Sequence, residues 1–282
     1  MRAWPAPAKL NLFLHILGRR ADGYHELQTC FQFVDLCDEL TINVRADGEI
    51  RRIAGDYAVA EQDDLCIRAA RALKAAAQSP LGADVGVLKR IPMGGGLGGG
   101  SSDAATCLVA LNYLWKLEWP VERLAALGLT LGADVPVFVR GRVAWAEGVG
   151  ERLTPLYPPL APAETNYLIL KPNVSISTAE VFQDPELTRN SPPITIHGFL
   201  ASGGRNDCLG VVRRRYTQVA RALDWLSAFG SARLTGTGAC VFLDCGTVER
   251  GRKIAREVPA QIDAFLARGL NDSPLLERLA AG

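Results

Sequence analysis

Six glycines lie between Pro92 and Asp103, interrupted only by Leu97, and two serines follow them. Clustered glycine is costly in conformational entropy, and folding alone gives little reason for it. Such a segment lets bare backbone N–H groups approach a ligand, while serine hydroxyls and the positive end of a following helix attract an anion. The segment therefore predicts a loop that binds a polyphosphate such as that of ATP.

The loop differs from two common nucleotide-binding patterns. No Lys-Ser or Lys-Thr pair closes it, as in a Walker A loop, and no acidic residue ends a second strand about twenty residues on, as in a dinucleotide fingerprint. A flexible linker is the alternative, but a strand pattern and a strongly apolar helix pattern flank the loop directly. The expected nucleotide contacts are Leu65, Lys89, Pro92, Met93, Gly94, Gly95, Gly96, Leu97, Gly98, Gly99, Gly100, Ser101, Ser102 and Asp103. For the last three, the sequence does not separate helix capping, phosphate contact and a water-mediated contact to magnesium.

Three segments resemble one superfamily of small-molecule kinases. PMGGGLGGGSSDAA is similar to the central motif of galactokinase, homoserine kinase, mevalonate kinase and phosphomevalonate kinase, and PAPAKLNLFL and LTGTGACVF resemble its other two motifs in the same order. Within this superfamily, RRADGYHEL, LTLGADVPVFVRG, EGVGE and KPNVSISTAEVF resemble the kinases of non-mevalonate isoprenoid synthesis, whose acceptor carries a cytidine diphosphate. The resemblance runs nearly end to end, and it implies transfer of phosphate from ATP, with Mg²⁺, to an alcohol.

The resemblance implies catalytic roles for two charged residues. Phosphoryl transfer needs positioning, charge neutralisation and removal of a hydroxyl proton. Asp134, in the short LGADVP connection, resembles the general base of the family. Lys9 follows the stiff Pro-Ala-Pro-Ala segment and, by resemblance, lies beside Asp134 and stabilises negative charge on the transferring phosphate. Outside this context, an Asp in a turn is usually a turn residue and a Lys after prolines is usually solvated.

The acceptor site is expected at the turn after ADG. Tyr24 can stack on a base, and His25 can hydrogen-bond to the edge of a pyrimidine. The resemblance assigns this pair to cytosine, with Phe182 as a second stacking face and Asn11 at the hydroxyl-bearing part of the acceptor. Alternatively, Tyr24 and His25 pack only on their own hairpin.

Composition limits the other possibilities. The formal net charge is +1, which gives no general attraction to nucleic acid or to an anionic membrane. No run approaches eighteen apolar residues, and prolines and polar residues interrupt the N-terminal segment as a signal peptide. The seven cysteines form no CxxC pair and there are only three histidines, so we expect reduced thiols in a cytoplasmic protein. The sequence indicates no metal ligands, protein partners or oligomeric state.

Hydrophobic periodicity and turn residues predict alternating strands and helices. Strands are expected at residues 8–17, 28–36, 39–47, 83–91, 167–172 and 264–271, with strand pairs within 142–156 and 232–246. Helices are expected at 63–77, after the glycine loop, and at 121–132, 177–184, 208–230 and 248–258. Residues 134–141 are expected to form a strand or turn, and 185–205 a surface loop.

These elements predict an α+β protein of two domains. A proline-rich stretch between Pro155 and Pro162 marks the boundary, giving an N-terminal ATP-binding domain at 1–157 and a C-terminal domain at 163–282. By resemblance, the first is like domain two of ribosomal protein S5 and the second is ferredoxin-like, with the active site in the cleft between them. The alternatives are another kinase of the superfamily, such as homoserine or mevalonate kinase, and a non-catalytic sensor. A nucleic-acid-binding protein is disfavoured by the near-neutral charge.

Overall fold

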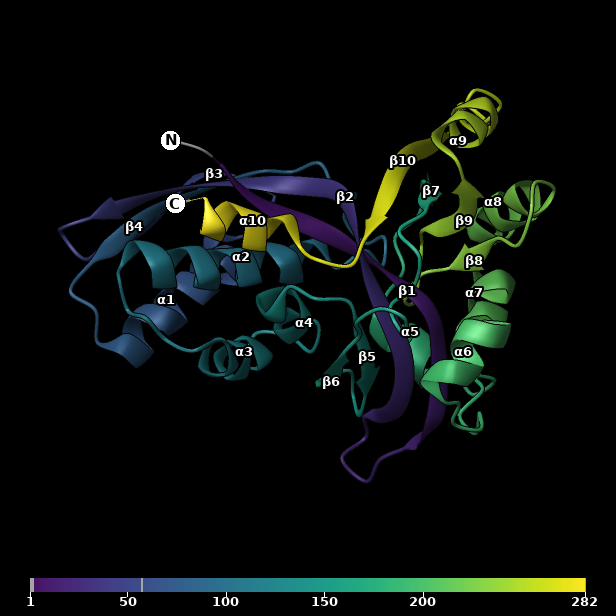
Figure 1. The fold of residues 1–282 in the computed structure, drawn as a ribbon, viewed down its shortest axis with the longest axis horizontal. Coiled ribbons are helices and arrows are strands. Elements are labelled where there is room, and N and C mark those ends of the chain that lie inside the picture. Colours follow the sequence, from purple (N-terminus) through teal and green to yellow (C-terminus); the bar gives the residue numbers. More distant parts are fainter. Residues whose placement is uncertain (1–2, 57, 282) are drawn as a thin grey trace.

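The computed structural model describes residues 3–56 and 58–281. Its framework is a pair of long antiparallel strands, β1 (Trp4–Arg19) and β2 (His25–Arg45), which run through both halves of the molecule (Figure 1). Tyr24 lies in the turn that joins them. The two strands therefore carry residues from both ends of the expected active site.

The sequence predicts two strands where the structure has the single strand β2. The register of its pairing with β1 shifts between Pro7 and Ala8, so that Asp35 and Leu36 have no residue opposite them. Such a β-bulge bends a strand without ending it. The polar residues at the bulge resemble a strand end in the sequence, and this explains the difference.

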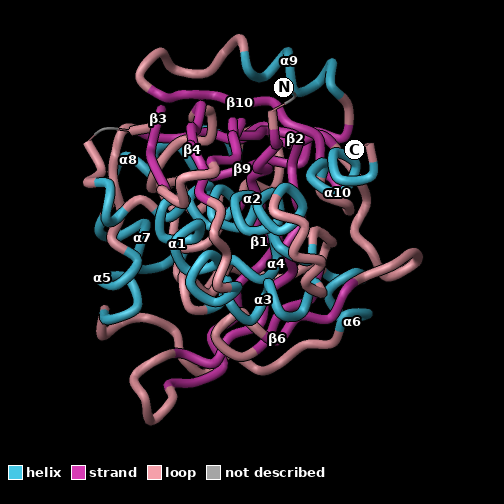
Figure 2. Tube along the Cα trace, turned by 90° about the vertical axis from the view of Figure 1, so that its left-hand side faces the viewer, coloured by secondary structure: helices cyan, strands magenta, loops and turns pink. Residues whose placement is uncertain are grey.

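Helices cover one face of the strands in the N-terminal half. The further elements there are β3 (Ile50–Ala54), a 3-10 turn η1 (Glu61–Asp63), α1 (Leu65–Ala77), β4 (Gly82–Leu88), α2 (Gly99–Leu114), α3 (Val121–Leu129), α4 (Val135–Arg140), β5 (Ala144–Glu147) and β6 (Arg152–Pro155). In Figure 2, α1 and α2 lie beneath β2 and β4, and their side chains share one buried core with these strands, including Leu40, Ile67 and Leu108. The carboxylate of Asp64 accepts hydrogen bonds from the first turn of α1 and caps this helix, which was expected at 63–77.

The C-terminal half has a second sheet region and a second core. Its elements are β7 (Asn166–Pro172), α5 (Thr178–Gln183), α6 (Ile196–Ser202), α7 (Leu209–Arg215), α8 (Thr217–Ser227), β8 (Arg233–Leu234), β9 (Val241–Gly246), α9 (Val248–Ala255), β10 (Ile262–Leu270) and α10 (Pro274–Ala280). Leu168 of β7 and Val241 of β9 pack with Val211, Leu223 and Ile254 from the covering helices. The predicted α+β class is confirmed.

One sheet joins the two halves. Its strand order is β3-β4-β2-β10-β7-β9-β8, because β10 hydrogen-bonds to both β2 and β7. A third core fills the junction, where Phe13 of β1 contacts the rings of Trp145 and Phe199. The halves are thus connected through continuous strand pairing.

The chain returns to the N-terminal half at its end. Helix α10 follows β10, and its Leu275 belongs to the N-terminal core, with Leu279 packed against that core. One boundary between residues 157 and 163 therefore does not separate the two cores completely. The domain bounds remain a prediction.

Residues 134–141 differ from the prediction, because they form the helix α4. The alternation in Val-Pro-Val-Phe-Val resembles a half-buried strand, but all five side chains are buried. Pro136 lies in the first turn, where a helix tolerates proline, and Gly141 ends the helix with φ +67°. The apolar residues of this segment are therefore explained by complete burial in a helix and not by the alternation of a half-buried strand.

Two other segments are more divided than predicted. The expected helix at 208–230 is two helices, α7 and α8, separated at Tyr216, whose φ of −126° and ψ of 87° are not helical. The expected surface loop at 185–205 contains α6, and Leu187 and Phe199 of this segment are buried in the cores.

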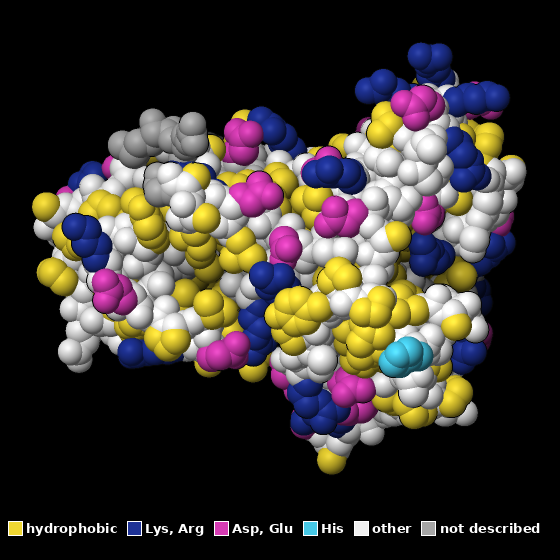
Figure 3. Space-filling model, viewed as in Figure 1, with side chains coloured by type: hydrophobic (Ala, Val, Ile, Leu, Met, Phe, Trp, Pro, Cys, Tyr) yellow, Lys and Arg dark blue, Asp and Glu magenta, His cyan; other side chains and the backbone are white. Residues whose placement is uncertain are grey.

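The surface carries both signs of charge, in keeping with the net charge of +1 (Figure 3). Exposed basic side chains gather over α9, among them Arg250, Arg252 and Lys253. Within the part of the chain that the structure describes, no helix has the length and apolar character needed to cross a membrane.

Candidate active site

The glycine loop is held by two other segments of the chain. The Lys9 N–H donates to the Leu97 carbonyl at 2.9 Å, and the N–H groups of Ala239 and Cys240 donate to the carbonyls of Gly94 and Gly95. Contacts on both sides give the loop one fixed shape, which a flexible linker would not have. The loop then leads directly into α2.

At two positions in the loop, the backbone angle and the packing both require glycine. Gly96 and Gly98 have φ of +74° and +73°. A Cβ on Gly96 would lie 2.4 Å from the Thr235 carbonyl oxygen, and one on Gly98 would lie 2.8 Å from the Phe138 ring. Side chains would therefore collide with the protein here, and the loop presents its bare backbone to the space outside.

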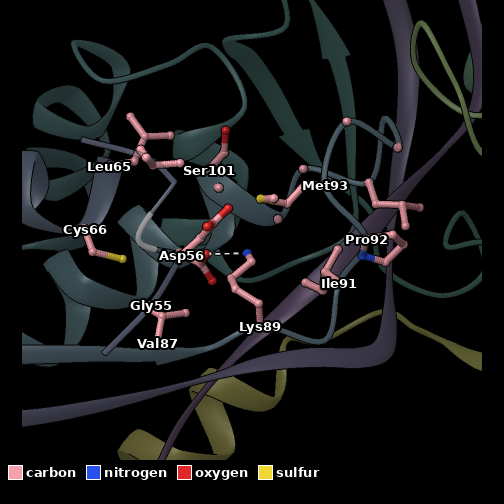
Figure 4. Close-up of a pocket in the computed structure, with 18 of the residues that line it drawn as sticks. Gly55, Asp56, Leu65, Cys66, Val87, Lys89, Ile91, Pro92, Met93 and Ser101 are labelled. Carbon is pink, nitrogen blue, oxygen red and sulfur yellow. Dashed lines mark hydrogen bonds and ion pairs between the residues drawn. The ribbon is translucent and has the colours of Figure 1, made fainter. Parts of the chain in front are cut away.

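A cavity of about 440 Å³ lies along the loop. We name it the nucleotide cavity after the ligand that the sequence predicts for it. Figure 4 shows Lys89 extending into the cavity, with Leu65 and Cys66 on one side and Pro92 and Met93 on the other. Every residue expected to bind ATP lines the cavity except Ser102. The side chain of Ser102 is fully buried, and its hydroxyl has no hydrogen-bond partner among the described residues.

Lys89 is held between two carboxylates. Its ammonium lies 2.5 Å from Asp38 Oδ2 and 2.7 Å from Asp103 Oδ2. Burial raises the pKa of Asp103 to about 7, although the charge of Lys89 opposes this. Burial also works against the charge of Lys89, but the two carboxylates outweigh it and raise the pKa of Lys89. The cluster therefore keeps a fixed positive group at the wall of the nucleotide cavity.

A second cavity, of about 870 Å³, lies on the other side of the loop. Residues of β1 and β2 line it together with α5 and the Gly236–Thr237 segment, so both halves of the molecule contribute. We name it the acceptor cavity after its predicted ligand. Gly96, Gly98 and Ser101 line both this cavity and the nucleotide cavity. The two cavities thus meet at the end of the glycine loop.

Lys9 and Asp134 lie where the cavities meet. The Lys9 ammonium is 3.4 Å from Asp134 Oδ2 and donates to the Gly96 carbonyl at 3.0 Å. The Lys9 side chain is buried, whereas that of Asp134 is 33% exposed, so the carboxylate is open to the acceptor cavity. Asp134 is the residue that precedes α4, which places it at a fixed point beside the loop.

Asn11 lines the acceptor cavity, but its carboxamide already has protein partners at both ends. Its Oδ1 accepts from the Lys9 ammonium at 2.5 Å, and its Nδ2 donates to Thr29 Oγ1 at 3.0 Å. Thr29 in turn donates to the Phe13 carbonyl. In this structure, Asn11 acts on the orientation of Lys9, and its contact with the acceptor remains a prediction.

The aromatic residues expected at the cytosine line the acceptor cavity far along the β1–β2 hairpin. Tyr24 is 65% exposed. His25 is buried, and its ring centroid lies 5.1 Å from that of Phe182, with a tilt of 33° between the rings. Phe182 therefore supports the imidazole, and Tyr24 is the aromatic side chain with an open face.

Sequence reasoning missed three residues in or beside the acceptor cavity. Thr178 and Thr237 line the acceptor cavity with their hydroxyls 2.9 Å apart. Both lie in quoted motifs, STAEVF and LTGTGACVF, so their polar side chains were the available signal. Arg189 hydrogen-bonds to His25 from the segment that was expected to be only a surface loop. No local pattern singles it out.

Two cavities that meet at one glycine loop are what a small-molecule kinase requires, since it must hold a nucleotide and an acceptor side by side. Residues 64–142 match the family model described as the GHMP kinases N terminal domain, and residues 196–264 match the GHMP kinases C terminal model. The chain is 56% identical over 277 residues to the 4-diphosphocytidyl-2-C-methyl-D-erythritol kinase of Ectopseudomonas mendocina, covering 98% of this chain and 94% of that protein. A Halorhodospira halophila protein of the same name is 54% identical, over 98% and 96% of the two chains. The chain belongs to the GHMP kinase family, among the 4-diphosphocytidyl-2-C-methyl-D-erythritol kinases.

Solved structures agree with this assignment. The fold is similar to a crystal structure of a 4-(cytidine 5'-diphospho)-2C-methyl-D-erythritol kinase, with a TM-score of 0.82 and 34% identity over 95% of this chain and 98% of that one. A mevalonate kinase matches with a TM-score of 0.71 at 16% identity, over 96% and 100% of the two chains. The second likeness concerns the fold alone. The predicted kinase activity and the two-domain kinase fold are thereby confirmed.

Proposed function

We propose that this kinase transfers the γ-phosphoryl group of ATP to the 2-hydroxyl of 4-diphosphocytidyl-2-C-methyl-D-erythritol, giving the 2-phosphate and ADP in non-mevalonate isoprenoid synthesis. The observation that carries the proposal is the meeting of the two cavities at Gly96, Gly98 and Ser101, with Lys9 and Asp134 beside the junction. A phosphoryl donor and an acceptor held on either side of this loop have their reacting ends together.

The residues at the junction suit phosphoryl transfer. Asp134 is a partly exposed carboxylate that can accept the proton of the acceptor hydroxyl. The Lys9 ammonium is fixed by Asn11 and by the Gly96 carbonyl, so it faces the developing negative charge without a cost of reorientation. The backbone of the loop and the start of α2 hold the phosphates of the nucleotide.

The glycine loop suits ATP because it faces the nucleotide cavity with backbone alone. The phosphates can therefore approach the backbone N–H groups closely. Mg²⁺ normally keeps waters and takes one or two protein oxygens beside the phosphates, whose charge it neutralises. Among the described residues, no three His, Cys, Asp or Glu side chains gather into a metal site. The hydroxyl of Ser101, which lines both cavities, is the protein oxygen that we assign to the ion.

The size and chemistry of the acceptor cavity support a large acceptor. At about 870 Å³ it is roughly twice the nucleotide cavity, which is more than a compact amino acid or sugar needs. Tyr24 and His25 line its far part, where they suit a base.

All seven cysteines are free thiols, which supports a reducing compartment such as the cytoplasm.

The test is release of ADP from ATP with single acceptors. We expect turnover with 4-diphosphocytidyl-2-C-methyl-D-erythritol and only background with homoserine, mevalonate or galactose. Turnover with one of these smaller acceptors in place of the cytidine compound would overturn the proposal and favour another activity of the superfamily.

A further inference from the structure

Arg189 links His25 and Phe182, the two residues whose rings lie together at the far end of the acceptor cavity. Its Nε donates to His25 Nε2 at 3.0 Å, and its Nη2 donates to the carbonyls of Phe182 and Asp184, each at 2.8 Å. Its Nη1 donates to the Leu187 carbonyl at 3.1 Å. One guanidinium thus ties the end of α5, which carries Phe182, to the start of β2, which carries His25.

Every acceptor of Arg189 among the described residues is neutral. Other arginines nearby differ: Arg214 and Arg215 pair with Asp184 and with Glu186 or Glu180. Three of its four hydrogen bonds hold carbonyls within residues 182–187, and the fourth is made to a side chain, the imidazole of His25. Arg189 therefore joins the backbone of this segment to the position and protonation of His25.

The hydrogen bond determines which nitrogen of His25 carries the proton. A guanidinium is always protonated and can only donate, so His25 Nε2 must offer its lone pair. The neutral imidazole then has its proton on Nδ1. Burial, followed by the charges of Arg189 and Arg19, lowers the pKa of His25, which keeps the ring neutral. Within the described chain no protein group is bonded to His25 Nδ1, so this donor is left for a ligand in the cavity.

We infer that Arg189 sets the base specificity of the acceptor site, by fixing His25 as an Nδ1–H donor and by holding its ring against Phe182. This inference rests on the proposed function, in which the acceptor carries a cytosine. Cytosine has a lone pair at N3 and accepts a hydrogen bond there. Uracil has an N–H at the same position, so its donor would face the donor of His25 and both would lose a partner. Arg189 is a positioning residue, since it acts through His25 and Phe182.

The first experiment compares CMP and UMP as inhibitors competing with the acceptor. In the native enzyme we expect CMP to bind at least about tenfold more tightly than UMP. Arg189→Met removes the donors and keeps the apolar stem. It should raise the KM of the acceptor and reduce the preference for CMP about tenfold, with little change in kcat at saturation or in the KM for ATP.

Two further variants separate specificity from general damage. Arg189→Lys keeps a group that can only donate, so it should retain part of the CMP preference even though the carbonyl contacts are lost. Arg213→Met is the matched control, because Arg213 lies on α7 and forms an exposed ion pair with Asp224. It should leave both inhibition constants unchanged.

A spectroscopic measurement tests the same point without any variant. ¹⁵N NMR of the histidines in the native enzyme should show His25 neutral, with its proton on Nδ1. Protonation on Nε2 would overturn the inference, as would a folded Arg189→Met enzyme that keeps the full preference for CMP. In both cases turnover of the cytidine acceptor would leave the proposed function standing. A native enzyme that neither phosphorylates the acceptor nor binds CMP would overturn both.

Discussion

The ammonium group of Lys9 lies 3.4 Å from the carboxylate of Asp134, and the two groups come from opposite ends of the N-terminal half of the chain. Lys9 is buried on β1, whereas Asp134 precedes a short helix and is one-third exposed. The difference in exposure separates their roles, because the open carboxylate can meet the acceptor while the buried ammonium stays fixed. The carboxylate is therefore the first group to test.

Asp134→Asn should lower kcat by about 10²–10⁴-fold, since an amide of the same shape cannot accept the hydroxyl proton. The affinity for ATP should change little, because the nucleotide is proposed to bind to the glycine loop and not to Asp134. Single-turnover kinetics and ATP calorimetry measure the two effects. Asp224→Asn, at an exposed ion pair on α8, is the control. Near-normal turnover by Asp134→Asn would remove Asp134 as the base.

Gly98→Ala should weaken ATP binding and lower turnover by about tenfold or more each. A Cβ at this position combines a φ of +73° with contacts of 2.8 Å to Phe138 and 3.1 Å to Lys9 Cε, and such strain costs about 1–3 kcal/mol. Gly210→Ala is the matched control, because a Cβ there meets open space. Equal ATP affinities for the two variants, measured by calorimetry, would show that the loop does not hold the nucleotide.

Lys89→Met should lower the free energy of unfolding by about 3 kcal/mol, because it leaves the buried carboxylates of Asp38 and Asp103 without their cation. Adding Asp103→Asn to this variant should restore part of the loss. Urea unfolding measures both changes, with Lys253→Met on the exposed face of α9 as the control. If the double variant is no more stable than Lys89→Met, the carboxylates are not the cause.

Tyr24→Ala should raise the KM of the acceptor about tenfold, since stacking of a base on an aromatic ring contributes about 1–3 kcal/mol. The KM for ATP should not change, because Tyr24 lines only the acceptor cavity. Tyr157→Ala removes another exposed tyrosine, one that lines neither cavity, and should have no effect on either constant. An unchanged acceptor KM in Tyr24→Ala would mean that the base lies elsewhere.

The affinity for the acceptor should be constant from about pH 6.5 to 8 and decrease only below pH 6.5, the ordinary pKa of histidine. The sign follows from the neutral His25, whose pKa is lowered by burial and by Arg189 and Arg19, so that protonation and loss of binding require more acid. Arg189→Met should move the decrease to higher pH. Inhibition by CMP, measured across this range, tests the shift. A decrease that begins at the same pH in both enzymes would contradict it.

The sequence predicted the site well where chemistry depends on a contiguous segment. Six glycines followed by two serines have few physical explanations other than the binding of an anion. The nucleotide cavity does lie along that loop. Lys9 and Asp134 were assigned through motifs, and the structure brings them together. Ser102 is the exception among the predicted nucleotide contacts. Neighbouring positions of a helix look alike in the sequence, but the side chain of Ser102 is fully buried.

The parts that were missed depend on contacts between distant segments. Arg189 and His25 are 164 residues apart in the chain, and only folding brings them within 3.0 Å. The helix α4 was predicted as a strand or turn because a short, fully buried apolar run has no periodicity that distinguishes a helix from a strand. Helix α10, a short segment at the end of the chain, was not anticipated because its apolar residues match a core formed by the first half. Local patterns contain no information on such partners.

The single sheet that joins the two halves has a consequence for the length of the acceptor. His25 lies near the turn of the β1–β2 hairpin and Lys9 lies nearer its other end, so strand register and not a hinge sets the separation between base and catalytic group. A frame held by hydrogen-bonded strands does not shorten to follow a smaller molecule. In the proposed site, an analogue with one phosphate fewer, bound by its cytosine, would therefore stop short of Asp134. We accordingly expect the hairpin to select the acceptor by its reach as well as by its base.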